Sequence, residues 1–255
     1  MQQRKLKIYF TSDVHGYFYP TTYGDMTEKN VGLFGCAGNF KKDEDTLILD
    51  GGDILQGSAF AYYCRQVADS PEVIADIMND CGYDYYTLGN HDFNYGLEYQ
   101  AAYRSRNNGV CVCQNITDEA GNTLFPWKLH TMKNGLRVGI VGIVTDYVNI
   151  WEKEENLKGI HITDPFEAAK NALAQMKEQT DLTICIYHGG FECDLESGET
   201  LSQTTENVGY RICKELDFDI LLTGHQHMSV PGRDISGTYT VQPLSLIHIS
   251  EPTRP

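Results

Sequence analysis

Short clusters rich in aspartate, asparagine and histidine recur along the chain, and each follows a run of residues with the pattern of a buried β-strand. The five clusters are Asp13-Val14-His15, Gly51-Gly52-Asp53, Gly89-Asn90-His91-Asp92, Tyr187-His188-Gly189-Gly190 and Gly224-His225-Gln226-His227. Carboxylate, amide and imidazole groups are ligands for divalent transition metals. Because the carboxyl ends of parallel strands meet at one edge of a sheet, ligands far apart in sequence can share a pocket. The pattern indicates a hydrolase with two metal ions.

The spacing inside the clusters supports this interpretation. Asp13 and His15 would share one face of an extended segment, and His225 and His227 repeat the arrangement. The two glycines before Asp53 would let the backbone pass close to the metals while the carboxylate projects between them as a bridge. A single pair of this kind is commonplace, whereas five clusters in this order predict a dinuclear site.

Alternating strands and helices are expected to position these clusters. Apolar and β-branched runs predict strands at residues 6–11, 46–49, 85–88, 110–114, 136–144, 182–187 and 219–223. Helical spacing and capping residues predict helices at 71–80, 97–106, 164–178 and 205–216. Asn134-Gly135 predicts a hairpin turn. The fold class expected from this order is an α/β sandwich of mixed β-sheets flanked by helices, with the metal site at the carboxyl ends of strands.

Charge and composition limit the partners. The chain has 255 residues and a formal net charge of -15. A long nucleic acid is not expected as a partner because phosphate contacts need a basic surface, but bound cations would still admit a small phosphorylated substrate. No run is apolar enough to span a bilayer, and residues 1–7 lack a secretory signal, so a cytoplasmic location is expected unless the gene start is missing. The acidic run at 152–155 is interpreted as a solvated surface.

The motifs resemble those of the calcineurin-like metallophosphoesterase superfamily over residues 6–243. They look most like the catalytic domain of the 5′-nucleotidase and 2′,3′-cyclic-nucleotide 2′-phosphodiesterase family. The resemblance is carried by Thr11-Ser12-Asp13-Val14-His15-Gly16, Leu49-Asp50-Gly51-Gly52-Asp53, Thr87-Leu88-Gly89-Asn90-His91-Asp92-Phe93-Asn94-Tyr95-Gly96 and Leu222-Thr223-Gly224-His225-Gln226-His227. The third segment is specific to this family within the superfamily. The implied activity is hydrolysis of nucleotides or related small phosphoesters.

The same resemblance implies a ligand set. One metal ion would be held by Asp13, His15, Asp53 and His227, and the second by Asp53, Asn90, His188 and His225. Manganese, iron, cobalt and zinc all suit these ligands. His91 is assigned to the substrate, as a general acid or as a stabiliser of charge on the leaving oxygen. The cations would activate a water molecule for attack on phosphorus.

One position departs from many 5′-nucleotidases, in which an aspartate stands three residues after the catalytic histidine. Asn94 occupies that place here and looks more like the cyclic-nucleotide branch. Asn94 and Asp92 are both predicted to serve His91 in the catalytic site, although Asp92 could equally be a turn carboxylate. His227 also stands where some 5′-nucleotidases have glutamine, which argues against a strict 5′-nucleotidase.

Residues 1–243 are predicted to form the catalytic domain, without the C-terminal domain that supplies nucleoside-binding side chains in the family. Residues 244–255 are interpreted as read-through of a transposase sequencing adapter, because Leu-Ser-Leu-Ile-His-Ile-Ser-Glu-Pro-Thr-Arg is what that adapter encodes. His248 is therefore excluded as a ligand. The alternative to an active hydrolase is a non-catalytic metal-binding module, or a fragment that is inactive without its second domain.

Overall fold

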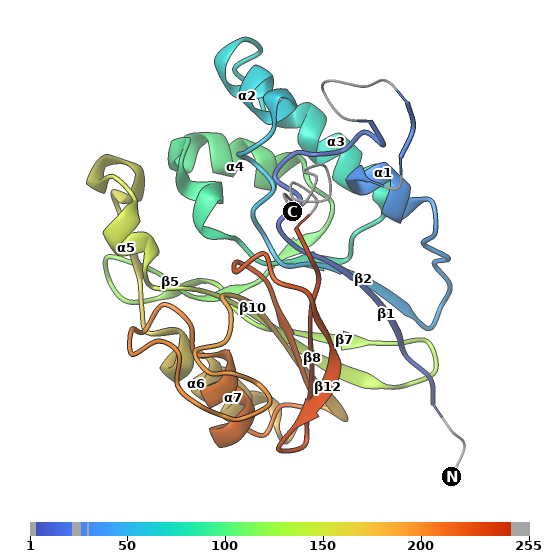
Figure 1. Ribbon diagram of the computed structural model, residues 1–255, viewed down its shortest axis with the longest axis vertical. Helices are drawn as coiled ribbons and strands as arrows, with labels where there is room; N and C mark the ends of the chain where they lie inside the picture. The colour runs from blue at the N-terminus through green and yellow to red at the C-terminus, as the bar shows by residue number, and fades with distance from the viewer. Residues whose placement is uncertain (1–3, 22–26, 30, 246–255) are drawn as a thin grey trace.

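The computed structural model describes residues 4–21, 27–29 and 31–245. Two β-sheets face each other, and helices cover the outer face of each (Figure 1). The first sheet is parallel, with the order β1 (Lys7–Thr11), β2 (Thr46–Asp50), β3 (Tyr85–Tyr86) and β4 (Val110–Cys111). The second is mixed, with the order β12 (Val230–Ile235), β13 (Thr238–Gln242), β11 (Ile220–Thr223), β10 (Leu182–His188), β8 (Arg137–Val144) and β7 (Lys128–Thr131). The antiparallel strands β6 (Thr123–Phe125), β5 (Cys113–Asp118) and β9 (Ile160–Ile162) form a third, smaller sheet.

Helices divide between the two outer faces. On the side of the first sheet lie α1 (Gly32–Ala37), α2 (Ala59–Gln66), α3 (Glu72–Cys81), the 3-10 helix η1 (Asn90–Phe93) and α4 (Gly96–Arg106). The later helices are α5 (Val148–Trp151), the 3-10 helix η2 (Glu154–Leu157), α6 (Pro165–Met176) and α7 (Gly209–Glu215). Among the described residues, no helix is long and apolar enough to cross a membrane.

The core explains why β2 is a continuous apolar run. Leu47 and Leu49 point into the space between the two sheets, where they pack with Ile140 and Ile184. Ile48 points to the opposite face and packs under the helices. Side chains of a strand alternate between its faces, so a strand covered on both sides needs apolar residues at every position.

The predicted α/β sandwich is confirmed, with corrections to single elements. The predicted strand at 110–114 is two strands, because β4 and β5 belong to different sheets and are separated by Val112. The predicted helix at 205–216 begins only at Gly209. Helices α1, α2 and α5 and the hairpin of β12 and β13 are additional to the predicted elements.

The end of the chain bears on the predicted domain boundary. Residues 246–255, including His248, lie outside the described residues. Ser245 is buried, and its hydroxyl donates to the backbone carbonyl of Asp13 at 2.9 Å. The boundary at residue 243 and the adapter origin of residues 244–255 stay predictions.

Candidate metal centre

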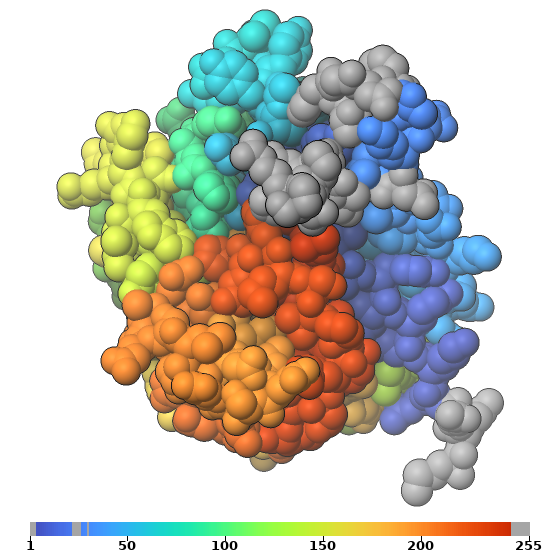
Figure 2. Space-filling view, in the orientation of Figure 1, coloured from blue at the N-terminus to red at the C-terminus, as the bar shows by residue number. Residues whose placement is uncertain are grey.

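The five clusters lie together, but two sheets rather than one deliver them. The clusters of Asp13, Asp53 and Asn90 follow β1, β2 and β3 of the first sheet. His188 ends β10, and His225 follows β11, in the second sheet. The backbone N–H of His225 donates to the Asp13 carboxylate at 3.0 Å, across 212 residues of sequence. In Figure 2, the blue N-terminal and the red C-terminal segments adjoin on the face shown.

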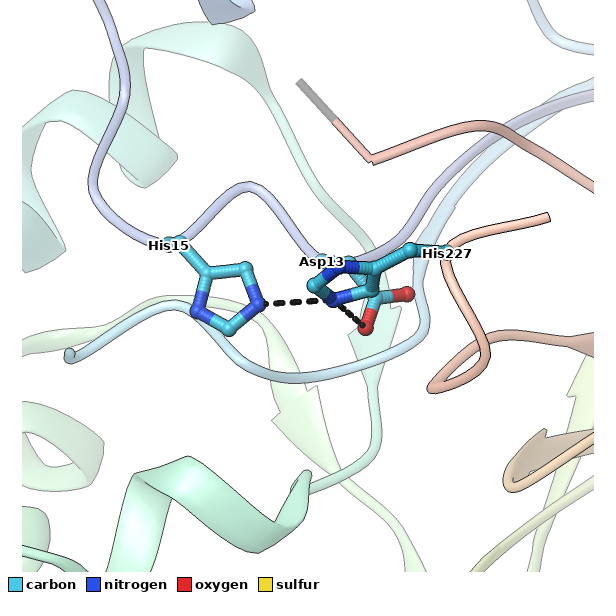
Figure 3. A group of neighbouring side chains, drawn as sticks. All are labelled: Asp13, His15 and His227. Atoms are coloured by element: carbon cyan, nitrogen blue, oxygen red, sulfur yellow. Dashed lines mark hydrogen bonds and ion pairs between the residues drawn. The ribbon is translucent and has the colours of Figure 1, made fainter. Parts of the chain in front are cut away.

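Asp13, His15 and His227 form one group of side chains. Figure 3 shows them pointing toward one another, with His227 between the other two. The Nε2 atoms of His15 and His227 are 3.1 Å apart, and His227 Nε2 is 3.3 Å from Asp13 Oδ1. These three side chains offer ligand atoms close enough to hold one ion.

A second group adjoins the first through Asp53. Asp53 Oδ2 is 3.2 Å from His188 Nε2 and 3.7 Å from His15 Nε2. Asn90 Oδ1 lies 3.1 Å from His188 Nε2 and 2.9 Å from His225 Nδ1. The structure thus brings all seven predicted ligands together. Asp53 lies near members of both groups, Asp13 belongs to both compact sets of ligand atoms, and the bridging role of Asp53 stays a prediction.

The hydrogen bonds of the histidines test whether this set fits metal ions. His15 Nδ1 faces the carbonyl oxygen of Gln56 at 2.7 Å, and His188 Nδ1 faces that of Gly51 at 2.6 Å. A carbonyl only accepts, so each neutral ring carries its hydrogen on Nδ1 and a lone pair on Nε2. His188 Nε2 faces Asp53 Oδ2, and His15 Nε2 faces His227 Nε2 and, at a longer distance, the same Asp53 oxygen. Acceptors facing acceptors in a buried site require a cation or a proton between them, and imidazole and carboxylate groups so arranged fit metal ions.

Electrostatics lead to the same conclusion. Burial alone would raise the pKa of Asp53, but His188 and His15 hold that pKa well below its ordinary value. Burial alone would lower the pKa of His188, whereas the carboxylates of Asp53 and Asp13 raise it to about 10. In the metal-free protein, a proton on His188 therefore supplies positive charge that bound cations would otherwise supply.

Most of the predicted ligands have an unusual backbone. Their φ angles are positive: 56° at Asp13, 52° at His15, 60° at Asp53, 72° at His225 and 52° at His227. The extended segment expected from Asp13 to His15 is therefore wrong, because both residues are left-handed. This conformation costs non-glycine residues roughly 1–3 kcal/mol each, and it is typical of functional sites whose surroundings impose it.

Asp92 holds the loop that carries Asp53. Its carboxylate accepts hydrogen bonds from the backbone N–H groups of Asp53, Ile54, Leu55 and Gly89, at 2.8–3.0 Å. Gly89 is needed there because a Cβ atom would overlap Asp53 and His188. Asp92 therefore connects the loops after β2 and β3, which favours its interpretation as a turn carboxylate.

His91 is positioned by two contacts. Its backbone N–H donates to Asp53 Oδ1 at 2.7 Å, so the residue is tied to the predicted bridge. Its side-chain Nδ1 lies 2.7 Å from Asn94 Oδ1. Of the two residues predicted to orient His91, Asn94 makes the contact to the imidazole. The catalytic roles of His91, Asp92 and Asn94 stay predictions.

The sequence profile of calcineurin-like phosphoesterases matches residues 6–229. This chain belongs to that family. Calcineurin-like phosphoesterases use two divalent metal ions, in agreement with the two adjoining groups of ligands.

The chain is also similar to individual proteins of known name. The chain is 29% identical to the trifunctional nucleotide phosphoesterase protein YfkN of Bacillus subtilis, over 92% of this chain and 17% of that protein. It is 27% identical to a 2′,3′-cyclic-nucleotide 2′-phosphodiesterase/3′-nucleotidase of Yersinia enterocolitica, over 91% of this chain and 38% of that protein. A Staphylococcus aureus structure described as a candidate 5′-nucleotidase superposes with a TM-score of 0.86 at 33% identity, covering 94% of this chain and 48% of that one. The chain therefore spans less than half the length of these relatives.

In this member of the family a cleft of about 470 Å³ adjoins the predicted ligands. It is lined by Asn90, His91, Asn94, Val148, Trp151, Glu152, Glu206, His225 and Gln226. The Trp151 ring stacks on that of His225, with centroids 5.5 Å apart and planes 26° apart. Glu206 Oε1 lies 3.0 Å from His225 Nε2.

Trp151 and Glu206 are additional to the residues predicted from the sequence. Trp151 ends the short helix α5 that comes after β8, so the rule that carboxyl strand ends gather at one edge points to its segment but not to its side chain. Glu206 lies in a polar loop between β10 and α7, where no pattern indicates a contact with His225.

Proposed function

We propose that this chain hydrolyses phosphoesters of nucleotides with two divalent metal ions, which are manganese, zinc, iron or cobalt. The observation that carries the proposal is the set of buried imidazole and carboxylate acceptors that face one another beside His91 and open onto the cleft. The names of the Yersinia and Staphylococcus relatives support a nucleotide substrate. Because the chain spans only part of those proteins, their activities do not transfer to it directly, and nucleotide hydrolysis by this chain is a proposal.

The ligand residues would hold the ions, and His91 would act on the leaving group. When bound, the ions would neutralise charge on the phosphate oxygens and lower the pKa of a water molecule. In the hydrolysis of a phosphoester, the water oxygen bonds to phosphorus, the ester P–O bond breaks, and the leaving oxygen takes a proton. Asn94 Oδ1 accepts from His91 Nδ1, so a protonated imidazole would carry its second hydrogen on Nε2 and give that hydrogen to the leaving oxygen.

The cleft supports a small nucleotide as the substrate. Trp151 is 48% exposed and offers a flat apolar face at the cleft wall, suited to a base or ribose. We expect 2′,3′-cyclic nucleotides and 3′-nucleotides to be hydrolysed faster than 5′-nucleotides, because Asn94 resembles the cyclic-nucleotide branch. A cytoplasmic location remains part of this proposal.

A substrate panel tests the proposal. The purified chain, loaded with Mn²⁺ or Zn²⁺, is incubated with 2′,3′-cyclic AMP, 3′-AMP, 5′-AMP and bis(p-nitrophenyl) phosphate. We expect turnover that depends on metal and that Asp53→Asn abolishes. A folded chain that holds two ions but cleaves none of these esters would contradict the proposal and support the non-catalytic alternative.

A further inference from the structure

Glu152 lies directly after α5, at the edge of the cleft that contains His91. Its place in the acidic run predicts a solvated side chain, and that prediction is wrong for this residue. Its carboxylate accepts hydrogen bonds from Asn94 Nδ2 at 2.6 Å, from Asn156 Nδ2 at 2.9 Å and from the backbone N–H of Lys153 at 2.8 Å. Its neighbour Glu154 is exposed, as expected.

These contacts form a chain of hydrogen bonds that ends on the imidazole. Glu152 Oε2 accepts from Asn94 Nδ2, and Asn94 Oδ1 faces His91 Nδ1 at 2.7 Å. A side-chain amide has an accepting oxygen at one end and a donating nitrogen at the other. Because a carboxylate only accepts, Glu152 draws the Asn94 nitrogen toward itself and leaves the oxygen for His91.

We propose that Glu152 is a positioning residue for His91 and that it acts by fixing the orientation of the Asn94 amide. With Asn94 Oδ1 as its partner, His91 Nδ1 carries a hydrogen, so a protonated imidazole presents its other N–H, at Nε2, to the substrate side. The inference rests on the proposed function, because Nε2 is the atom that would protonate the leaving oxygen. Glu152 thus does through an amide what an aspartate in contact with the histidine does directly.

The variant Glu152→Gln changes this orientation with little change in shape. A glutamine has one accepting oxygen, and Asn156 and Lys153 both donate to the side of Oε1. The glutamine nitrogen therefore turns to Asn94, whose amide must flip and present its own nitrogen to His91 Nδ1. His91 Nδ1 must then accept, so only the neutral ring with its hydrogen on Nε2 fits, and the protonated ring that would act as the acid is disfavoured.

The double variant Glu152→Gln with Asn94→Asp is the rescue. The carboxylate introduced by Asn94→Asp can accept from the glutamine nitrogen and from His91 Nδ1 at once, so the original tautomer returns. Asn94→Asp alone places two carboxylates side by side and should be less active than the double variant. Glu154→Gln, in the same acidic run, is the matched control.

Kinetics give the first readout. For 3′-AMP, we expect Glu152→Gln to lower kcat by about 10- to 100-fold with KM nearly unchanged, and the double variant to restore most of that loss. For bis(p-nitrophenyl) phosphate, whose leaving group needs no proton, the loss should be small. A residue that only supported the fold would not be rescued by changing Asn94 to aspartate.

Histidine ¹⁵N NMR of the zinc-loaded protein gives a readout that is independent of turnover. With signals assigned by comparison with His91→Asn, His91 should be the Nδ1–H tautomer in the wild type, the Nε2–H tautomer in Glu152→Gln, and Nδ1–H again in the double variant. An unchanged tautomer in Glu152→Gln, or a double variant no more active than that single variant, would overturn the proposal. These tautomers in a wild type that cleaves no phosphoester would support the positioning role and contradict the proposed function instead.

Discussion

Asp53→Asn tests the predicted metal bridge against an equally buried aspartate, Asp50, which ends β2 three residues earlier. Asp53 is 1% exposed and faces His188, whereas Asp50 is 2% exposed and is bonded to Thr11 Oγ1 and to the backbone N–H of Gly52. Both substitutions to asparagine preserve size and remove one carboxylate. Only the first removes an oxygen that two predicted metal sites share, so we expect Asp53→Asn to lose both ions and Asp50→Asn to keep them.

The structure also sets the scale of the stability change. The carboxylates raise the pKa of His188 to about 10 from its ordinary 6.5, and Asp13 still faces His188 at 4.0 Å after the substitution. Removing Asp53 from this buried pair should therefore destabilise the metal-free protein by on the order of 3–5 kcal/mol at pH 7. Burial raises the pKa of Asp50 to about 7, so that group is already partly neutral. Asp50→Asn should cost about 1 kcal/mol or less.

Elemental analysis and urea unfolding measure the two quantities. Metal content per chain is determined after purification without chelator, and the free energy of unfolding is determined at pH 7 in EDTA. Two ions per chain in folded Asp53→Asn would refute the bridge. Equal destabilisation by the two substitutions would refute the proposed coupling between Asp53 and His188.

Other perturbations address the neighbours of the bridge. His91→Asn should keep both ions but lower turnover by about 10²- to 10⁴-fold on esters with poor leaving groups, and equal loss on nitrophenyl esters would argue against an acid role. Because the pKa of His188 is raised, its protonation stabilises the metal-free fold fully below pH 6.5, and this stabilisation is lost as the pH rises through about 10. Urea unfolding in EDTA at pH 6.5 and 10 measures this loss, which should shrink in His188→Gln; a wild type equally stable at both values contradicts it. Glu206→Ala should weaken the ion at His225 by about 10- to 100-fold in a chelator competition and leave the other ion unchanged, and unchanged affinity for both ions would exclude a role for Glu206.

The chemistry of the site could be predicted because the types of residue in the clusters indicate metal ligands. Aspartate and histidine clusters after apolar runs indicate ligands at strand ends, and the structure brings Asp13, Asp53 and His188 within reach of one another. Their mutual distances could not be predicted, because the clusters come from two sheets whose facing depends on packing between Leu49 and residues such as Ile184. No local pattern specifies that contact.

Residues that act through another residue were harder to predict. Glu152 belongs to an acidic run whose other members are exposed, and only the approach of η1 to the end of α5 places it against Asn94. Glu206 reaches His225 from a loop with no regular structure. In both cases the partner lies far away in sequence, and the residue type alone is equally common on solvated surfaces.

The ligand loops are held by the protein as well as by any ion. Left-handed backbone at Asp13, His15 and Asp53 is favoured relative to most residues by their residue types but is still uncommon, so tertiary contacts must stabilise it. The loops after β1 and β2 supply such contacts: Asp13 N–H donates to the Gly52 carbonyl at 3.0 Å, and His15 N–H donates to that of Asp53 at 2.7 Å. The Asp92 carboxylate also holds the loop of Asp53, because it accepts a hydrogen bond from the backbone N–H of Asp53. These bonds join backbone to backbone or to a carboxylate outside the ligand set, so they hold the ligand loops through contacts that do not involve the predicted ligand atoms.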